Sequence, residues 1–531
     1  MKYKIKIFPM GLEIDAKAGI MLHEVCKQAG INLTTYCNGF DICGKCKVQI
    51  LTPKNSKISE NDKKLIHETE LKENYRLACG FKVESSMEIF IPENSLLKNI
   101  DGLIDTQNIV VNCKSNSNKY GLAIDLGTTT IAVSLMNCST GEVCAVYSAL
   151  NKQAVYGADV ISRIDYSLKA QGLQQLHEAV IDTIEEAITY ICERSSITRN
   201  KIEEVVVAGN TTMQHILLKE ELSGLASLPF EPTIKTAQYV PAKKLDINLE
   251  AMVYIYPVIG GFVGGDTVAC AMATKLFESK NTVLLIDIGT NGEVFLLHNE
   301  KMYAASAPAG PAFEGRGISC GMHGIAGAIE HLKITETKFL LEVISETEPK
   351  GICGSGLIDC TAEFLKFKML DETGRVVDRE ELKESPEYLN EAIIEEKNGN
   401  DILIYSNKNS QLKLTQKDFR EVQLAKAAIA VSWNLLLNRA GINISDLDCV
   451  YMAGAFGNHL DPNNSSYLNL IPKIELQKII NIGNAASTGA KILLVNPEQR
   501  IIAENLAKQT EHIELAKEPD FMMVYAEQML F

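Results

Sequence analysis

Four cysteines near the start of the chain have the spacing of a metal-cluster site. Cys37, Cys43 and Cys46 lie in "YCNGFDICGKC" and Cys79 follows in "YRLACGF", which gives the pattern C-x5-C-x2-C-x32-C. Proteins can bind a [2Fe-2S] cluster through a C-x4-C-x2-C loop and a distant fourth cysteine, and the first gap here is one residue longer. Glycines in the loop let the backbone pass close to the sulfides. The spacing predicts that these four thiolates ligate a [2Fe-2S] cluster.

The alternative for the same cysteines is a structural zinc site. Zinc ligands usually come as two close pairs, and only Cys43 and Cys46 form such a pair. A zinc site is therefore the less favoured interpretation, after the [2Fe-2S] cluster. Cys26 lies on the helical stretch before the loop, and we expect it to be a core residue.

Two glycine-threonine turns form a second candidate site. "YGLAIDLGTTTIAVSLMN" (120–137) and "TVLLIDIGTNGEVFLLHN" (282–299) align without a gap, placing Asp287 on Asp125 and Thr290 on Thr128. The Walker pattern G-x-x-x-x-G-K-[ST] is absent from the sequence. Backbone N–H groups and hydroxyls in a tight turn can bind phosphate, and the two aspartates can hold hydrated Mg²⁺. The pair predicts two matched lobes, each opening with a phosphate-binding β-hairpin.

Three further motifs fit a nucleotide site. Residues 260–277 and 484–494 read as small-residue helices, and "VYMAGAFGN" (450–458) reads as a strand entering a glycine turn suited to adenosine. Asp266, at the start of the first of these helices, is a candidate to orient an attacking water. A helix N-terminal cap is the equally good alternative for Asp266.

The elements that must position these residues alternate between strands and helices. "KYKIKIF" and "SSMEIFIPE" have the period of strands, whereas 173–195 and 422–441 have the period of long helices. We expect an α+β ferredoxin-like β-grasp domain followed by an α/β ATPase body of two ribonuclease-H-like lobes. The expected boundaries are these: cluster domain 1–98, linker 99–118, first lobe 119–280, and second lobe with the adenosine motif 281–531.

The composition argues against nucleic-acid and membrane partners. With Lys+Arg 52 against Asp+Glu 67, the net charge of −15 repels nucleic acid. The sequence shows neither a signal peptide nor an apolar run long enough for a membrane helix. Fourteen cysteines without an export signal indicate reduced thiols, so we expect a cytoplasmic protein with no membrane partner.

The order of hairpin, small-residue helix, hairpin, glycine turn and small-residue helix resembles the ATP site of the superfamily that holds acetate and sugar kinases, heat-shock chaperones and actin. Together with the cluster domain and with "GADVISRI", "AGNTTMQHIL", "GPAFEG" and "GICGSGLID", nearly the whole chain resembles the ATP-dependent reductive activators of corrinoid proteins. The resemblance implies transfer of one electron from the cluster to inactive Co(II), which restores Co(I) for methyl transfer.

The resemblance also implies the cofactors, partners and site residues. The cofactors are the [2Fe-2S] cluster, ATP and Mg²⁺. The implied partner is a corrinoid protein, either a methyltransferase or a corrinoid iron-sulfur protein. The sequence does not identify the upstream electron donor. The implied oligomer is a homodimer. The residues implied for adenosine are Gly454 and Ala455. The residues implied for phosphate and Mg²⁺ are Asp125, Gly127, Thr128, Thr129, Thr130, Asp287, Gly289, Thr290 and Asn291.

Other functions fit parts of the same pattern. A kinase or chaperone-like ATPase could carry the cluster as a sensor or a structural element, and a plain electron carrier could use the ATPase body for docking. An activator of another low-potential metalloenzyme, such as a 2-hydroxyacyl-CoA dehydratase, could share a cluster between subunits through Cys320 and Cys353.

Overall fold

The structure is a computed structural model that describes most of the 531-residue chain. The described residues are 2–29, 31, 33, 46–54, 56–66, 68–92, 95, 119–397, 399–408, 410–454 and 457–531. Cys37, Cys43, Ala455 and the expected linker 99–118 lie outside these residues.

The N-terminal module is built around one mixed sheet with the strand order β2-β1-β5-β3-β4. Its central pair, β1 and β5, is parallel, and the other neighbours are antiparallel. The expected period-2 burial is present in β1, where Ile5 and Ile7 are fully buried. Helix α1 (Leu22–Gln28) buries Cys26 in the same core, as expected for this thiol. The other elements of the module are β1 (Lys2–Phe8), β2 (Leu12–Lys17), β3 (Lys47–Thr52), α2 (Glu60–Leu65), α3 (Glu68–Lys72), β4 (Tyr75–Leu77) and β5 (Met87–Phe90).

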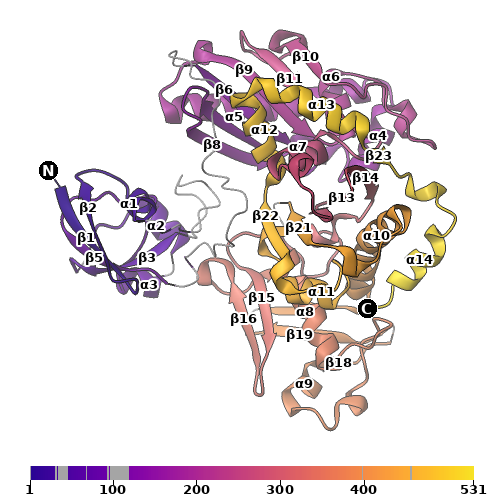
Figure 1. The fold of residues 1–531 in the computed structure, drawn as a ribbon. Helices are drawn as coiled ribbons and strands as arrows, with labels where there is room; N and C mark the ends of the chain where they lie inside the picture. The colour runs from indigo at the N-terminus through magenta and orange to yellow at the C-terminus, as the bar shows by residue number, and fades with distance from the viewer. Residues whose placement is uncertain are drawn as a thin grey trace. The chain divides into compact units, whose positions relative to one another are not determined.

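The ATPase body contains two sheets with the same plan, which confirms the expected pair of lobes (Figure 1). Each sheet opens with an antiparallel three-stranded meander and adds two parallel strands on the side of the first strand. The first sheet then ends on an antiparallel strand, and the second carries one more parallel strand at its opposite edge. The first sheet has the order β10-β11-β9-β6-β7-β8: β6 (Tyr120–Leu126), β7 (Thr130–Asn137), β8 (Val143–Leu150), β9 (Ile202–Gly209), β10 (Gln238–Pro241) and β11 (Met252–Ile255). The second has the order β22-β21-β12-β13-β14-β23: β12 (Val283–Ile288), β13 (Gly292–His298), β14 (Lys301–Ala307), β21 (Cys449–Ala453), β22 (Ile479–Gly483) and β23 (Glu511–His512).

The helices of the ATPase body cover both faces of these sheets. The two long helices predicted from sequence are α5 (Gly172–Ser195) and α10 (Gln416–Ala440). The two predicted small-residue helices are α7 (Gly265–Ala273) and α12 (Ala485–Val495). The remaining helices are α4 (Val160–Ser167), α6 (Thr211–Leu218), α8 (Gly354–Lys366), α9 (Glu387–Ala392), α11 (Pro462–Tyr467), α13 (Arg500–Gln509) and α14 (Phe521–Gln528).

A single hydrophobic core joins the two lobes through α7, α12 and α13. It contains Ala123 and Val206 of the first sheet, Leu285 and Phe295 of the second, and the small side chains of the three helices. Figure 1 shows the yellow helices α12 and α13 beside the first sheet, although they come from the end of the chain. The lobe expected at 119–280 is therefore completed by residues after 484.

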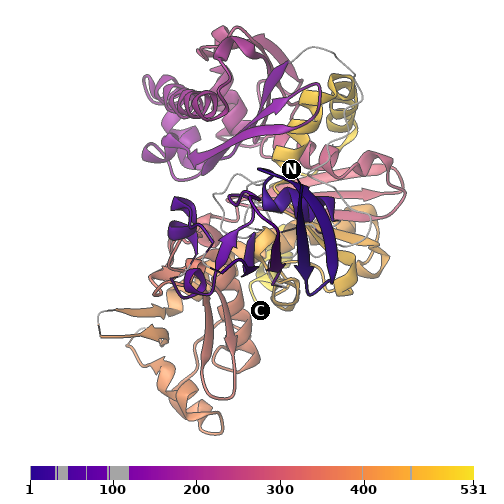
Figure 2. The same cartoon turned by 90° about the vertical axis from the view of Figure 1, so that its left-hand side faces the viewer.

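The segment after α8 is an insertion that protrudes from the second lobe in both views (Figures 1 and 2). Charged side chains are frequent in residues 379–400, yet this part of the insertion includes a strand of a small sheet and buries Leu389 and Ile393. Its strands are β18 (Ile393–Ile394), β19 (Asp401–Ser406) and β20 (Gln411–Leu414), and the hairpin before α8 consists of β15 (Ala328–Ile334) and β16 (Phe339–Val343), with β17 (Gly351–Ile352) beside β15.

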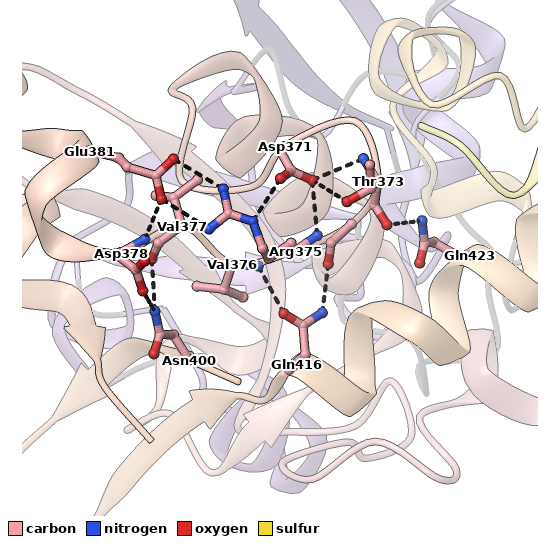
Figure 3. Close-up of polar contacts among 11 residues, drawn as sticks. Asp371, Thr373, Arg375, Val376, Val377, Asp378, Glu381, Asn400, Gln416 and Gln423 are labelled. Carbon is pink, nitrogen blue, oxygen red and sulfur yellow. Dashed lines mark hydrogen bonds and ion pairs between the residues drawn. The ribbon is translucent and has the colours of Figure 1, made fainter. Parts of the chain in front are cut away.

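An arginine fixes the entry to this insertion (Figure 3). The Arg375 guanidinium donates to Asp371 at 3.0 Å and to both carboxylate oxygens of Glu381 at 2.9 and 3.0 Å. Gln416 in the first turn of α10 accepts from the Val376 N–H at 2.9 Å, and Gln423 donates to the Thr373 carbonyl at 2.9 Å. The turn before the insertion is thereby bonded to the N-terminal half of α10.

In the part of the chain that the structure describes, no helix combines the length and the apolar character that crossing a membrane requires.

Candidate functional site

The two described cysteines of the predicted cluster lie together. Cys46 directly precedes β3 and Cys79 follows β4, and the two strands pair with Lys47 opposite Leu77. The Cys46 thiol donates to the Cys79 sulfur at 3.1 Å, and the two side chains are 0% and 4% exposed. A hydrogen bond from the Ala78 N–H to the Cys46 carbonyl, 2.9 Å long, holds the two strand ends in register. Two converging buried thiols fit a cluster bound by thiolates.

The two glycine-threonine turns that the sequence predicts to bind phosphate lie next to each other, one from each lobe. Thr129 Oγ1 and Thr290 Oγ1 are 3.4 Å apart, although 161 residues separate them in sequence. Thr128 accepts a hydrogen bond of 2.9 Å from the side chain of Asn210, the N-cap residue of α6. The two predicted turns thus meet at one place, as a nucleotide site between lobes requires.

Glycines shape both turns. A Cβ on Gly127 would lie 2.5 Å from the Thr130 carbonyl oxygen, so a side chain there would block the turn. The Gly289 N–H donates to the Asn291 carbonyl at 3.1 Å, which closes the second turn. Thr128, Thr290 and Asn291 are buried, whereas Thr130 is exposed at the start of β7.

Four acidic side chains gather behind the loops. Asp125 and Asp287 are the second-last residues of β6 and β12. Asp287 pairs with Glu293 on β13, and Asp266 lies in the first turn of α7. Burial raises the pKa of Asp125 and of Asp287 to about 6, with the Asp125 charge adding to the effect on Asp287. Burial and then Asp287 raise the pKa of Asp266 to about 7, and burial raises the pKa of Glu293 well above its usual range.

Repulsion within this acidic set is what a divalent cation would relieve, so the residues fit hydrated Mg²⁺. Among the described residues, no three His, Cys, Asp or Glu side chains are arranged to hold one metal ion directly. Mg²⁺ commonly keeps several waters and binds through one or two carboxylates and substrate phosphates. Asp125 and Asp287 are the two members of the set that the sequence predicts to act through such waters.

Asp266 does not cap α7. Gly264 holds the N-cap position, and Asp266 lies two residues further on, where its Oδ1 accepts from the Thr267 N–H at 2.8 Å. The capping alternative weighed for this residue is therefore wrong, because the helix begins at Gly265. The Asp266 carboxyl remains a candidate to orient the attacking water.

The glycine turn after β21 lies against the second phosphate loop. Asp287 pairs with Ala453, and Gly454 follows with a φ of +97°. A Cβ on Gly454 would lie 2.6 Å from the Ile288 carbonyl oxygen and 2.7 Å from Asp287 Oδ1. The expected adenosine motif and the expected Mg²⁺ carboxylate are therefore direct neighbours.

Helix α12 supplies two residues that sequence reasoning missed. Asn484, its N-cap, donates to Asp125 Oδ2 at 2.6 Å and opposes the rise in the Asp125 pKa. Lys491 is 7% exposed, and burial lowers its pKa to about 8 while the charge of Asp125 acts in the other direction. Both residues lie in the small-residue helix predicted at 484–494, so the sequence indicated the helix but not the role of its polar residues.

Glu314 is the third missed residue. It lies in the quoted "GPAFEG" and accepts hydrogen bonds from Thr129 Oγ1, at 2.6 Å, and from Thr290 Oγ1. No spacing rule joins this carboxylate to the two threonines, because it comes from a separate one-turn helix, η7 (Pro311–Glu314).

Cys320 and Cys353 do not form a cluster site by themselves. Cys353 is buried at the N-cap of α8, and its thiol donates to the Ile329 carbonyl at 3.3 Å. Burial raises the pKa of Cys320 to about 12 and also raises that of Cys353, which disfavours the thiolates that iron requires.

Comparisons with known proteins match every part of this architecture. Residues 5–84 match the 2Fe-2S iron-sulfur cluster binding domain, residues 120–279 the RACo middle region, and residues 281–531 the C-terminal domain of RACo, described as the ASKHA domain. The class is therefore an ASKHA-type ATPase joined to a [2Fe-2S] domain, with ATP and Mg²⁺ as the further cofactors.

Similarity extends over most or nearly all of the length of individual relatives. The corrinoid activation enzyme RamQ of Eubacterium limosum is 32% identical over 98% of this chain and 97% of its own. The [Co(II) methylated amine-specific corrinoid protein] reductase of Methanosarcina barkeri is 26% identical over 76% of each chain. A solved structure titled "Reductive activator for corrinoid,iron-sulfur protein" superimposes with a TM-score of 0.71 and 28% identity, covering 100% of this chain and 98% of that one. The chain belongs to the family of ATP-dependent reductive activators of corrinoid proteins.

Proposed function

We propose that this protein uses ATP to return one electron from its [2Fe-2S] cluster to the inactive Co(II) of a corrinoid protein. The observation that carries the proposal is the full-length similarity to a corrinoid activation enzyme, in a chain whose two phosphate loops meet and whose described cluster cysteines converge. The remaining two ligands of the cluster would be Cys37 and Cys43.

The reaction needs ATP for a thermodynamic reason. A plant-type cluster has a potential of about −400 mV, and each ~59 mV by which the cobalt couple lies lower costs roughly tenfold in a one-electron equilibrium. ATP assists by favouring a complex in which the axial ligation of cobalt changes, because binding shifts an equilibrium only by its differential affinity for two states. The two lobes supply such states if their arrangement differs with and without ATP between the two turns, which are already in contact in this structure.

The residues divide the work between the two modules. When bound, the cluster supplies electrons one at a time, and Cys46 and Cys79 hold it from the strand side. Asp125 and Asp287 hold hydrated Mg²⁺, Asp266 orients the attacking water, and Gly454 and Ala455 face adenosine. The phosphate oxygens are bound by the two turns, which contain Gly127, Thr128, Thr129, Thr130, Gly289, Thr290 and Asn291.

The proposal includes a cytoplasmic location, because fourteen cysteines and an iron-sulfur cluster require a reducing compartment. The corrinoid partner is a methyltransferase or a corrinoid iron-sulfur protein, and the oligomer is a homodimer. Genomic neighbourhood is the direct way to choose between the two partners.

The test follows the cobalt spectrum. Dithionite-reduced protein is mixed anaerobically with Co(II) corrinoid protein, with and without ATP, and fast reduction only with ATP supports the proposal. Transfer that ignores ATP points to a plain electron carrier, and phosphorylation of a small molecule points to a kinase; either result overturns the proposal.

Two variants and their matched controls separate the modules. Cys46→Ser should abolish cobalt reduction and spare ATP binding, whereas Cys144→Ser, at a half-buried thiol of β8, should leave reduction unchanged. Asp287→Asn should abolish ATP-dependent reduction and spare the visible spectrum of the cluster, whereas Asp182→Asn, on the exposed face of α5, should change neither. Loss of both activities in either variant would contradict this division.

A further inference from the structure

The Glu314 carboxylate occupies the point where the phosphate loops of the two lobes meet. Thr129 Oγ1 from the first loop donates to Glu314 Oε2 at 2.6 Å, and Thr290 Oγ1 from the second loop donates to Glu314 Oε1. The two threonine oxygens are themselves 3.4 Å apart. One carboxylate, with one oxygen for each lobe, therefore joins loops that are 161 residues apart in sequence.

A carboxylate and a phosphate group compete for such donors. Both are anionic acceptors, and hydroxyl groups donate to both in the same way. A phosphate that enters between the loops needs the hydroxyls that Glu314 now holds, and its negative charge repels the carboxylate. The carboxylate and a phosphate group cannot both occupy the position between Thr129 and Thr290. Binding of ATP there therefore requires that Glu314 loses both hydrogen bonds.

The chain around Glu314 allows this exchange. Gly310 and Gly315 lie on either side of η7 with φ of +77° and +78°, and Gly317 has a φ of +77°. Phe313, the neighbour of Glu314, is 1% exposed and anchors the turn in the core. A short anchored turn between glycines can reorient one side chain without unfolding.

The far end of the same segment is bonded to the body of the second lobe. Ser319 donates through its N–H to Asp418 Oδ1 at 2.8 Å, in the first turn of α10. The Met322 N–H donates to the Ile352 carbonyl at 2.8 Å, and the Ile352 N–H donates to the Cys320 carbonyl at 2.8 Å. A movement at Glu314 therefore acts on a segment, 315–322, whose far end is hydrogen-bonded to the second lobe.

We propose that Glu314 is a positioning residue that stands in for phosphate: it holds Thr129 and Thr290 in register, and ATP displaces it. Glu314 thereby sets the affinity for ATP and transmits nucleotide binding to residues 315–322. This inference rests on the proposed function, because it assigns the two threonines to phosphate.

The test begins with nucleotide affinity of the holoprotein, without corrinoid protein. Glu314→Gln keeps the size of the side chain and removes its charge, so the competitor for the two hydroxyls is weaker. Hydrogen bonds to charged groups are stronger than neutral ones, so a non-hydrolysable ATP analogue should bind about 5- to 30-fold more tightly. The KM for ATP should fall by a similar factor, with kcat changed much less.

Hydrogen exchange supplies the second readout. In the wild type, the ATP analogue should change the exchange of the 311–322 amides, and in Glu314→Gln this change should be much smaller. Glu336→Gln, at an exposed carboxylate in the turn between β15 and β16, is the matched control and should behave as wild type in both measurements.

The outcomes separate this inference from the function beneath it. Weaker ATP binding by Glu314→Gln would mean a structural role, and a loss of kcat of about 100-fold or more at unchanged affinity would mean a general base; either result overturns the inference. Unchanged affinity and exchange overturn it as well. Failure of the wild type to bind the analogue would instead overturn the proposed function.

Discussion

Replacing Gly454 with alanine tests whether the glycine turn and the Mg²⁺ carboxylate are coupled as the structure places them. Gly454 has a φ of +97°, and an added Cβ would lie 2.6 Å from the Ile288 carbonyl oxygen and 2.7 Å from Asp287 Oδ1. Both distances are shorter than van der Waals contact, and one of the atoms belongs to the backbone of β12.

The magnitude follows from two separate costs. Positive φ costs an alanine about 1–2 kcal/mol relative to glycine, and overpacking costs about 1–3 kcal/mol more. The free energy of unfolding of the second lobe should therefore fall by about 2–5 kcal/mol. Displacement of the Asp287 carboxylate should also weaken ATP binding by about tenfold or more, since tenfold corresponds to ~1.4 kcal/mol.

Gly441→Ala is the matched control. Gly441 ends α10 with a φ of +70°, and its added Cβ would have no atom within 4 Å. This variant should show only the backbone cost of about 1–2 kcal/mol and normal ATP binding.

The assay uses the single tryptophan of the chain. Trp433 is 1% exposed within α10, so its fluorescence in a urea titration reports unfolding of the second lobe. Equal destabilisation by Gly454→Ala and Gly441→Ala would show that the contact with Ile288 and Asp287 costs nothing. Normal ATP affinity in Gly454→Ala would refute the coupling to Asp287.

Two further predictions concern the core between the lobes and the acidic set. A Cβ on Gly489 of α12 would lie 2.1 Å from the Ala269 carbonyl oxygen of α7, so Gly489→Ala should lower the free energy of unfolding by about 1–3 kcal/mol. It should also weaken ATP binding, because α12 carries Lys491 and is capped by Asn484. An unchanged thermal unfolding curve would contradict this packing. The Asp266 pKa is raised from 3.8 to about 7, so this carboxyl favours the folded state when protonated, and that contribution is lost as pH rises from about 4 to 7. Asp266→Asn should therefore raise the Tm of the nucleotide- and Mg²⁺-free protein at pH 8, by the equivalent of up to about 4 kcal/mol, and raise it less at pH 5; an equal shift at both pH values would refute the role of ionisation.

Local patterns in the sequence were sufficient to predict the elements of the ATP site. The matched hairpins, the two small-residue helices and the strand before Gly454 are all present, because periodicity and turn glycines are properties of short segments. The small sheet of the insertion after α8 was not predicted, because its first strand, β18, has only two residues and is too short to show a periodic pattern.

The sequence by itself determined which chemistry is available: four thiols with cluster spacing, two phosphate turns and their aspartates. Only the tertiary structure decided that Glu314 joins Thr129 to Thr290, that Asn484 and Lys491 approach Asp125, and that α12 and α13 complete the first lobe. These pairings join residues up to 359 positions apart, as Asn484 and Asp125 are. Long-range contacts depend on how buried faces pack, and no periodicity within one segment records its partner.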